Sequence, residues 1–68
     1  MVTVGATVLA KFGPNDYWAC TVLSVNQRER TAEVQAFHGA PRRHDVLSFR
    51  DLAEVSRDTC RRLGLSVS

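Results

Sequence analysis

Apolar and polar residues alternate along this chain in short runs, and each run ends at residues that favour turns. In the clearest run, residues 31–37, Ala32, Val34 and Ala36 occupy every second position. A period of two residues places alternate side chains on opposite faces of a β-strand, whereas a helix needs a period near 3.6. The pattern therefore predicts strands rather than helices over most of the chain.

Turn-forming residues divide the alternating region into five strands. Residues 13–16 combine glycine, proline, asparagine and aspartate, residues 26–30 are polar, and residues 38–43 contain glycine and proline. Residues 50–52 are expected to form a single 3₁₀ turn. The predicted strands cover residues 5–12, 17–25, 31–37, 44–49 and 53–55.

Five short strands in 68 residues predict an all-β fold, a small five-stranded antiparallel barrel. Closure is expected because a flat sheet of this size would leave one face and both edges bare. A bulge near Ser24 is expected to turn Val25 inward. The expected core takes apolar residues from one face of each strand: Val8, Ala10, Cys20, Val22, Val34, Val46 and Leu52.

The last residues predict a short tail or helix. Ser56 can cap a helix, arginines lie near its end, and Gly64 can stop it. Its low apolar content predicts shallow packing, with Cys60 exposed. We therefore divide the chain into a barrel over residues 4–55 and a basic C-terminal extension over residues 56–68.

The net charge of +2 comes from this extension. Basic and acidic residues are equal in number between residues 4 and 55, whereas arginines outnumber acids beyond them. A neutral body binds phosphate backbones poorly, because nonspecific affinity rises with the number of phosphates neutralised. Nucleic-acid contact is therefore expected to be weak, and its candidate residues are Arg42, Arg43, Arg61 and Arg62.

No arrangement of residues typical of catalysis or cofactor binding occurs in the sequence. Cys20 and Cys60 lack CxxC spacing, and neither His38 nor His44 has a carboxylate or serine at a catalytic spacing. We therefore predict a protein that is not an enzyme and uses no cofactor or metal. Because there is neither a secretory signal nor an apolar run near roughly 20 residues, an intracellular location with no membrane partner and reduced thiols is expected.

Several motifs, in this order, resemble those of the Tudor domain. They are VLAKF at 8–12 with the turn at 13–16, YWACTV at 17–22, VQAFHG at 34–39 and RDL at 50–52. The first two strands are also similar to the start of a PWWP domain, but that fold appends a helical bundle longer than the thirteen residues after residue 55. Both families are SH3-like barrels that bind methylated lysine or arginine.

The resemblance implies a ligand pocket built from aromatic side chains, whose π-faces solvate a methylated ammonium better than water does. In this chain, aromatic residues occupy the matching positions at the end of the first strand, the start of the second strand and the end of the third strand. A further aromatic residue and a carboxylate lie next to the start of the second strand. These cage candidates are Phe12, Trp18, Phe37, Tyr17 and Asp16.

The chain departs from the family pattern after the third strand. The fourth aromatic wall falls at Ala40 or Pro41 and is missing, and Arg42 near the rim would repel a cation. Burial in the core is an equally simple role for Phe12 and Trp18, and strand parity predicts that Phe37 is exposed. The implied cage is therefore incomplete, and weak binding or none is expected.

Three functions stay open. The first is a non-enzymatic peptide-recognition module, a weak reader of methylated lysine or arginine on a histone tail or another peptide; the resemblance then implies chromatin and the nucleus. The second is a nucleic-acid contact module that uses the Arg42-Arg43 loop and the basic extension. The third is an adaptor without a cage, docking on other proteins through Phe37 and a sheet edge.

Overall fold

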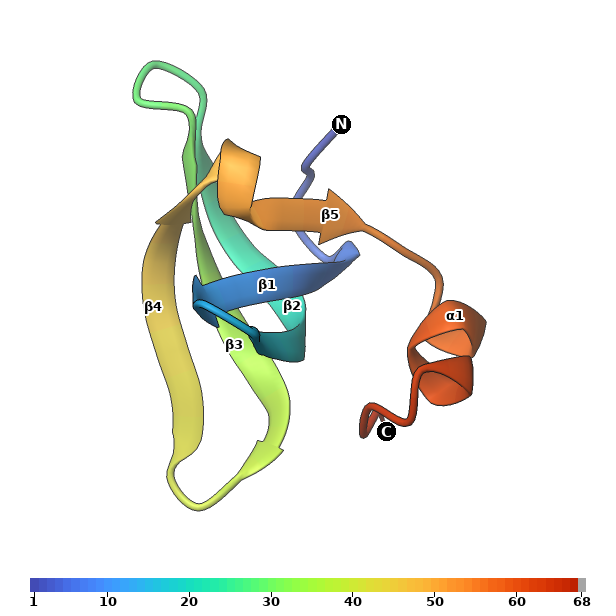
Figure 1. The fold of residues 1–68 in the computed structure, drawn as a ribbon. Coiled ribbons are helices and arrows are strands. Elements are labelled where there is room, and N and C mark those ends of the chain that lie inside the picture. Colours follow the sequence, from blue (N-terminus) through green and yellow to red (C-terminus); the bar gives the residue numbers. More distant parts are fainter. Residues whose placement is uncertain (68) are drawn as a thin grey trace.

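The computed structural model describes residues 1–67 and consists of one five-stranded sheet, a 3₁₀ turn and a short helix (Figure 1). The strands are antiparallel and lie in the order β4-β3-β2-β1-β5. The predicted all-β class is confirmed, with strand boundaries shifted by one or two residues. The elements are β1 (Thr7–Gly13), β2 (Asp16–Asn26), β3 (Thr31–Gly39), β4 (Arg42–Ser48), η1 (Phe49–Asp51), β5 (Leu52–Glu54) and α1 (Arg57–Arg62).

The sheet is strongly curved, so that β1 crosses in front of β2 and β3, and β5 lies beside β1 (Figure 1). The turn η1 leads the chain from the end of β4 to β5. Its Phe49 amide donates a 2.9 Å hydrogen bond to the Arg30 carbonyl, which ties η1 to the β2–β3 turn. The result is a small barrel-like fold, compatible with an SH3-like barrel.

The main core lies inside this curvature and is built from small side chains. Its fully buried members are Val8, Ala10, Cys20, Val22, Ala32, Val34 and Ala36. Around them pack partly buried residues that include Phe12, Trp18, Val25, Leu47 and Leu52. These residues come from β1, β2 and β3, and each is an alanine, a valine or a cysteine.

Two expectations about the core need correction, and a third is confirmed. Val46 is 57% exposed, because it pairs with the outward-facing Glu33, whereas Leu47 pairs with buried Ala32 and turns inward. Leu52 is only partly buried. The expected bulge is present as a register shift between Val22 and Ser24, after which Val25 faces the core.

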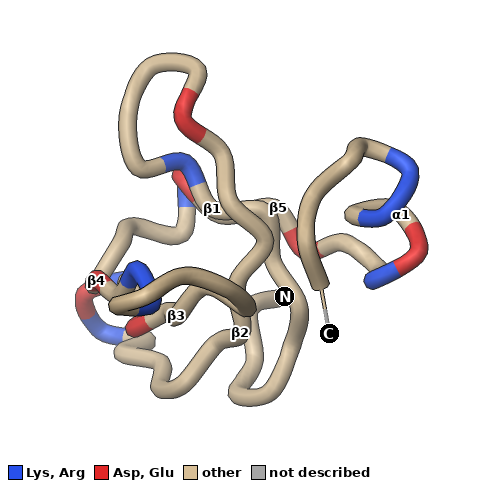
Figure 2. Tube along the Cα trace, turned by 90° about the horizontal axis from the view of Figure 1, so that it is seen from below, with Lys and Arg blue, Asp and Glu red and all other residues tan. Residues whose placement is uncertain are grey.

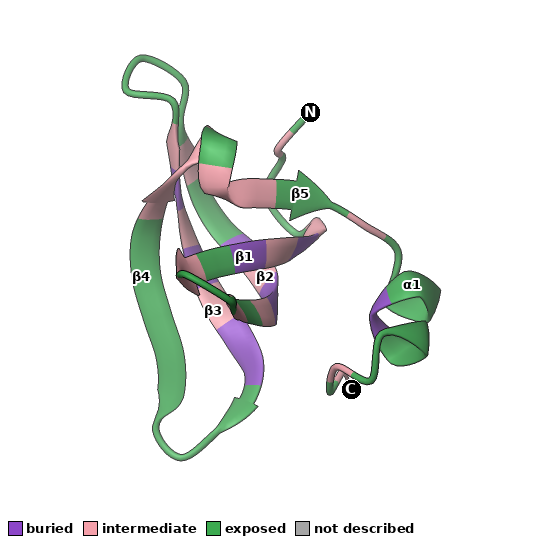
Figure 3. Cartoon of the chain, in the orientation of Figure 1, coloured by how far each residue is buried: buried purple, intermediate pink, exposed green. Residues whose placement is uncertain are grey.

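A second, smaller cluster lies on the outer side of the sheet. It contains Ala19, Phe37 and Cys60, with Val55, Leu65 and Val67 packed against them. Phe37 is 8% exposed and Cys60 is fully buried, so the predictions that both are exposed were wrong. Figure 3 shows this burial at the end of β3 and on the inner side of α1, whereas most of β4 is exposed.

Local signals in the sequence place this cluster. Ser56 caps α1 by accepting a 3.1 Å hydrogen bond from the Thr59 amide. Gly64 adopts a φ of 80° after the helix, and the Leu65 amide then donates to the Cys60 carbonyl at 2.9 Å, a common way to end a helix. The reversal turns Leu65 back toward the sheet, so the helix packs more closely than its composition predicts. No helix within residues 1–67 is long and apolar enough to span a membrane.

Candidate functional site

Two aromatic rings, one carboxylate and one guanidinium meet at the end of the β1–β2 hairpin. The Arg43 guanidinium carbon lies 4.6 Å from the centre of the Phe12 ring and 5.6 Å from that of Trp18. Asp16 accepts a 2.8 Å hydrogen bond from the Trp18 indole and, with its other oxygen, a 2.9 Å bond from Arg43. We call Phe12, Asp16 and Trp18 the cation clamp, because together they hold a positively charged side chain.

The β1–β2 hairpin positions all three clamp residues. Gly13 pairs with Asp16, so only Pro14 and Asn15 form the turn. Asn15 adopts a φ of 60°, a conformation that asparagine tolerates better than most residues. A register irregularity between Lys11 and Gly13 falls at Phe12, and such irregularities redirect a side chain. A tight turn with a bulge therefore brings Phe12 beside Trp18, which faces the main core.

The β3–β4 hairpin delivers Arg43 to the clamp. Gly39 has a φ of 132°, and a Cβ atom there would lie 3.0 Å from the Pro41 carbonyl oxygen. Only glycine fits this backbone without strain. Gly39 pairs with Arg42, so the chain reverses at once and β4 returns alongside β3. Arg43, the second residue of β4, then lies over the rings of the β1–β2 hairpin.

The clamp is partly open to solvent. The Arg43 side chain is 43% exposed and that of Asp16 is 40% exposed. An ion pair with this exposure stabilises a fold by about 0–1 kcal/mol, and each exposed cation–π contact adds about 0.5–1 kcal/mol. Arg43 is therefore held by several modest contacts, which another cation can replace without disrupting a buried charge.

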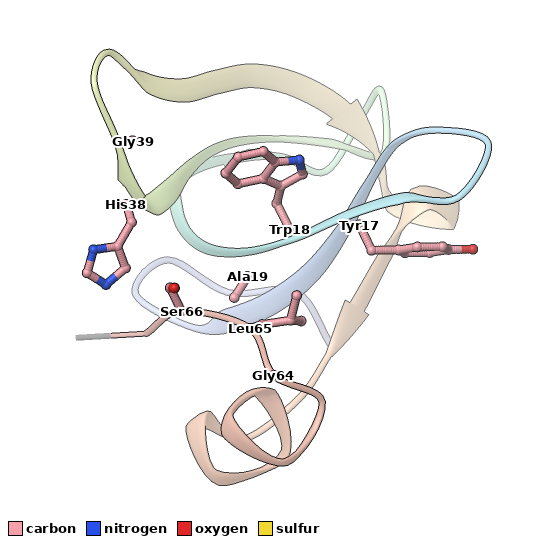
Figure 4. A pocket seen from close by; sticks show the side chains of 8 residues that line it. All are labelled: Tyr17, Trp18, Ala19, His38, Gly39, Gly64, Leu65 and Ser66. Carbon is pink, nitrogen blue, oxygen red and sulfur yellow. The ribbon is translucent and has the colours of Figure 1, made fainter.

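The structure does not bring the five cage candidates together. Phe12, Asp16 and Trp18 converge, but Phe37 lies in the outer cluster, where the Arg57 guanidinium carbon is 5.3 Å from its ring centre. Tyr17 points away from Trp18, as consecutive residues of a strand must (Figure 4). The clamp therefore has two aromatic walls and a carboxylate.

The four arginines proposed for nucleic-acid contact lie in two separate places. Arg42 and Arg43 begin β4, and Arg61 and Arg62 end α1, which lies on the opposite side of the molecule from β4 (Figures 1 and 2). Arg43 pairs with Asp16, and Arg61 pairs with Asp58 at 2.9 Å. Figure 2 shows acidic segments interspersed among the basic ones. This arrangement does not form a continuous cationic surface.

The titratable groups with shifted pKa values include two buried thiols and one surface carboxylate. Burial raises the pKa of the Cys20 thiol to about 11 and also raises the pKa of Cys60, which makes both thiols poor nucleophiles. Hydrogen bonds from Ser24 and His44 lower the pKa of Glu33 on the sheet surface. Within residues 1–67, no group of three or more His, Cys, Asp or Glu side chains is placed to hold a metal ion.

Sequence reasoning missed Arg43 as a partner of the rings and assigned the positive charge at the pocket rim to Arg42. Arg43 and Asp16 are 27 positions apart, and the pairing of β3 with β4 is irregular between Gln35 and Gly39. Arg42 was chosen because it matches the position of a polar residue in the Tudor pattern, and that match takes no account of the irregular pairing. No local signal in the sequence identifies which arginine reaches the clamp.

Comparison with known proteins yields no relative: no family model, curated protein or solved structure matches this chain.

Proposed function

We propose that this protein is a non-enzymatic peptide-recognition module whose cation clamp binds a positively charged side chain of a partner, such as a methylated arginine or lysine. The observation that carries the proposal is the position of Arg43. Its guanidinium lies against the Phe12 and Trp18 rings and pairs with Asp16. An arginine of the chain itself thus occupies the place that a ligand's cation would take.

The chemistry of the clamp suits a planar, weakly hydrated cation. Aromatic faces attract the charge, and the Asp16 carboxylate accepts an N–H hydrogen bond while it is itself fixed by the Trp18 indole. A dimethylated guanidinium keeps its charge and at least one N–H donor, and its methyl groups favour ring contact over water. We therefore expect arginine and methylarginine peptides to bind more tightly than trimethyllysine peptides, which offer Asp16 no hydrogen.

Arg43 makes the expected affinity low. A ligand must displace Arg43, so its net binding free energy is the difference between its own contacts with the clamp and the contacts that Arg43 loses. The site also lacks the aromatic walls that Phe37 and the Ala40 position would supply. Binding in the high-micromolar range or weaker is expected for the native chain, since the clamp is open for only a fraction of the time.

The test is a two-dimensional NMR titration of the native chain with matched peptides that carry arginine, asymmetric dimethylarginine, lysine or trimethyllysine at one position. We expect shifts at Phe12, Asp16, Trp18 and Arg43 with the arginine series, and their loss in Asp16→Asn. Val46→Ala, an exposed change on β4 outside the clamp, is the matched control. Binding that survives Asp16→Asn, or no shift at millimolar peptide, would contradict the proposal.

A nucleic-acid contact function is less well supported. Two of its four candidate arginines are already paired with carboxylates, and the two pairs of arginines lie on opposite sides of the molecule (Figure 2). A short DNA duplex belongs in the same titration. Shifts confined to Arg42, Arg61 and Arg62 would favour this alternative over the clamp.

A further inference from the structure

An apolar groove lies on the outer face of the sheet, on the side that Tyr17 faces. Leu9, Tyr17, Leu63 and Leu65 line a cleft of about 290 Å³, and we call these four residues the outer groove. Tyr17 is 47% exposed and Leu63 is 59% exposed. Figure 4 shows Tyr17 and Leu65 on the outer side of β2, whereas Trp18 points to the other side.

Strand pairing explains why these side chains gather. Leu9 pairs with Ala19 and Lys11 pairs with Tyr17, and directly paired residues of antiparallel strands share a face. Ala19 is small and buried beneath the C-terminal segment. The reversal after α1 brings Leu65 back over this face, and Leu63 borders the same cleft. The groove therefore has a floor of β1 and β2 and a wall from the residues that follow α1.

A cationic rim continues the groove along β1. Leu9 and Tyr17 also line an adjoining cleft of about 280 Å³ whose other residues include Lys11, Arg50 and Asp51. Neither Lys11 nor Arg50 forms an ion pair with another of residues 1–67. Two unpaired cations and one carboxylate leave this end of the groove net positive.

We propose that the outer groove docks a peptide segment of a partner protein that places one or two bulky apolar side chains beside acidic residues. The apolar side chains would cover Leu9, Tyr17 and the two C-terminal leucines, where exposed apolar area favours association. The acidic residues would lie beside Lys11 and Arg50, which selects against basic segments. This site is separate from the cation clamp, and the two can be occupied together.

The test is selection from a random-heptapeptide display library on the immobilised chain, followed by titration of an enriched peptide by fluorescence anisotropy. We expect enriched peptides to combine Leu, Phe or Trp with Asp or Glu. Truncating an aromatic residue at the centre of a site costs about tenfold or more in affinity, so Tyr17→Ala should weaken binding by that amount. Lys11→Glu, an exposed change that tests the rim separately, should weaken it about fivefold.

Two control variants test whether the loss of binding is specific to the outer groove. Leu23→Ala removes another exposed apolar side chain of β2 and should leave binding unchanged, as should Asp16→Asn, which disables only the clamp. The proposal is overturned if no peptide is enriched over the bare surface, if enriched peptides are basic, or if they bind Tyr17→Ala equally well. It is also overturned if light scattering shows a dimer that Tyr17→Ala dissociates, since a second copy would then be the occupant.

Discussion

Replacing Arg43 by alanine should strengthen binding of a cationic ligand, because it removes the side chain that occupies the clamp. The magnitude follows from the contacts. A half-exposed ion pair with Asp16 contributes about 0–1 kcal/mol, and two ring contacts contribute about 0.5–1 kcal/mol each. Ordering the arginine side chain opposes them by up to about 2 kcal/mol. A net stabilisation near 1 kcal/mol leaves the clamp open in about one molecule in six, so Arg43→Ala should raise the apparent affinity about sixfold.

The assay uses the fluorescence of Trp18, the single tryptophan of the chain and itself a wall of the clamp. Titration with a peptide that carries asymmetric dimethylarginine gives the dissociation constant for the native chain and for Arg43→Ala. The matched control is Arg42→Ala, which removes the same charge from the adjacent residue of β4. A melting curve of each variant should show a decrease of about 4–8 °C for Arg43→Ala, as a loss near 1 kcal/mol implies for a domain of this size.

An unchanged or weaker affinity in Arg43→Ala would refute this reasoning. Arg43 would then support the site instead of competing for it. An equal gain in Arg42→Ala would show that the effect comes from net charge and not from occupancy of the clamp.

Three further predictions concern the core, the thiols and the surface. Val22→Ala should destabilise the fold by about 2 kcal/mol, since it removes buried methyl groups and leaves a cavity, whereas Val46→Ala should change stability by less than about 0.5 kcal/mol; denaturant melts measure both. Cys20 and Cys60 should resist a thiol reagent at pH 8 and react once urea unfolds the chain, because burial raises both pKa values; rapid reaction without urea would contradict their burial. The pKa of Glu33 is lower in the folded chain than its ordinary value of 4.5. The ionised Glu33 side chain therefore stabilises the fold above pH 4.5, and this stabilisation is lost as the pH falls through the folded-state pKa. The melting temperature of Glu33→Gln should lie below that of the native chain at pH 7, and the difference between the two should disappear in acid.

Much of the fold could be predicted from the sequence because strands, turns and one bulge leave local signals. The alternation of Ala32, Val34 and Ala36 fixed the inward face of β3, and the turn residues marked the hairpins. The inward face of β4 was harder to assign. Val46 and Leu47 are adjacent and equally apolar, and only pairing with β3 decides which of them faces the core.

The errors share a different cause, which is contact between distant parts of the chain. Phe37 does point away from the main core, as its parity predicts, but the segment after α1 covers it. Cys60 is buried because α1 packs against Ala19 and Phe37 of the sheet, although the helix itself carries few apolar residues. The candidate site was predictable only in part: Phe12, Asp16 and Trp18 are close in sequence, whereas Arg43 arrives from another hairpin through an irregular register.

The most direct test of the central claim follows the Arg43 side chain itself. An NMR experiment that detects arginine Nε–Hε groups can monitor Arg43 during titration with the dimethylarginine peptide, with the Trp18 indole N–H recorded in parallel. We predict that the Arg43 signal begins at a position shifted by the neighbouring rings and moves toward that of an exposed arginine as the ligand enters, while the Trp18 signal also changes. An Arg43 signal that keeps its ring-shifted position at saturating peptide would show that the ligand binds elsewhere, and would contradict the assignment of the clamp as the recognition site.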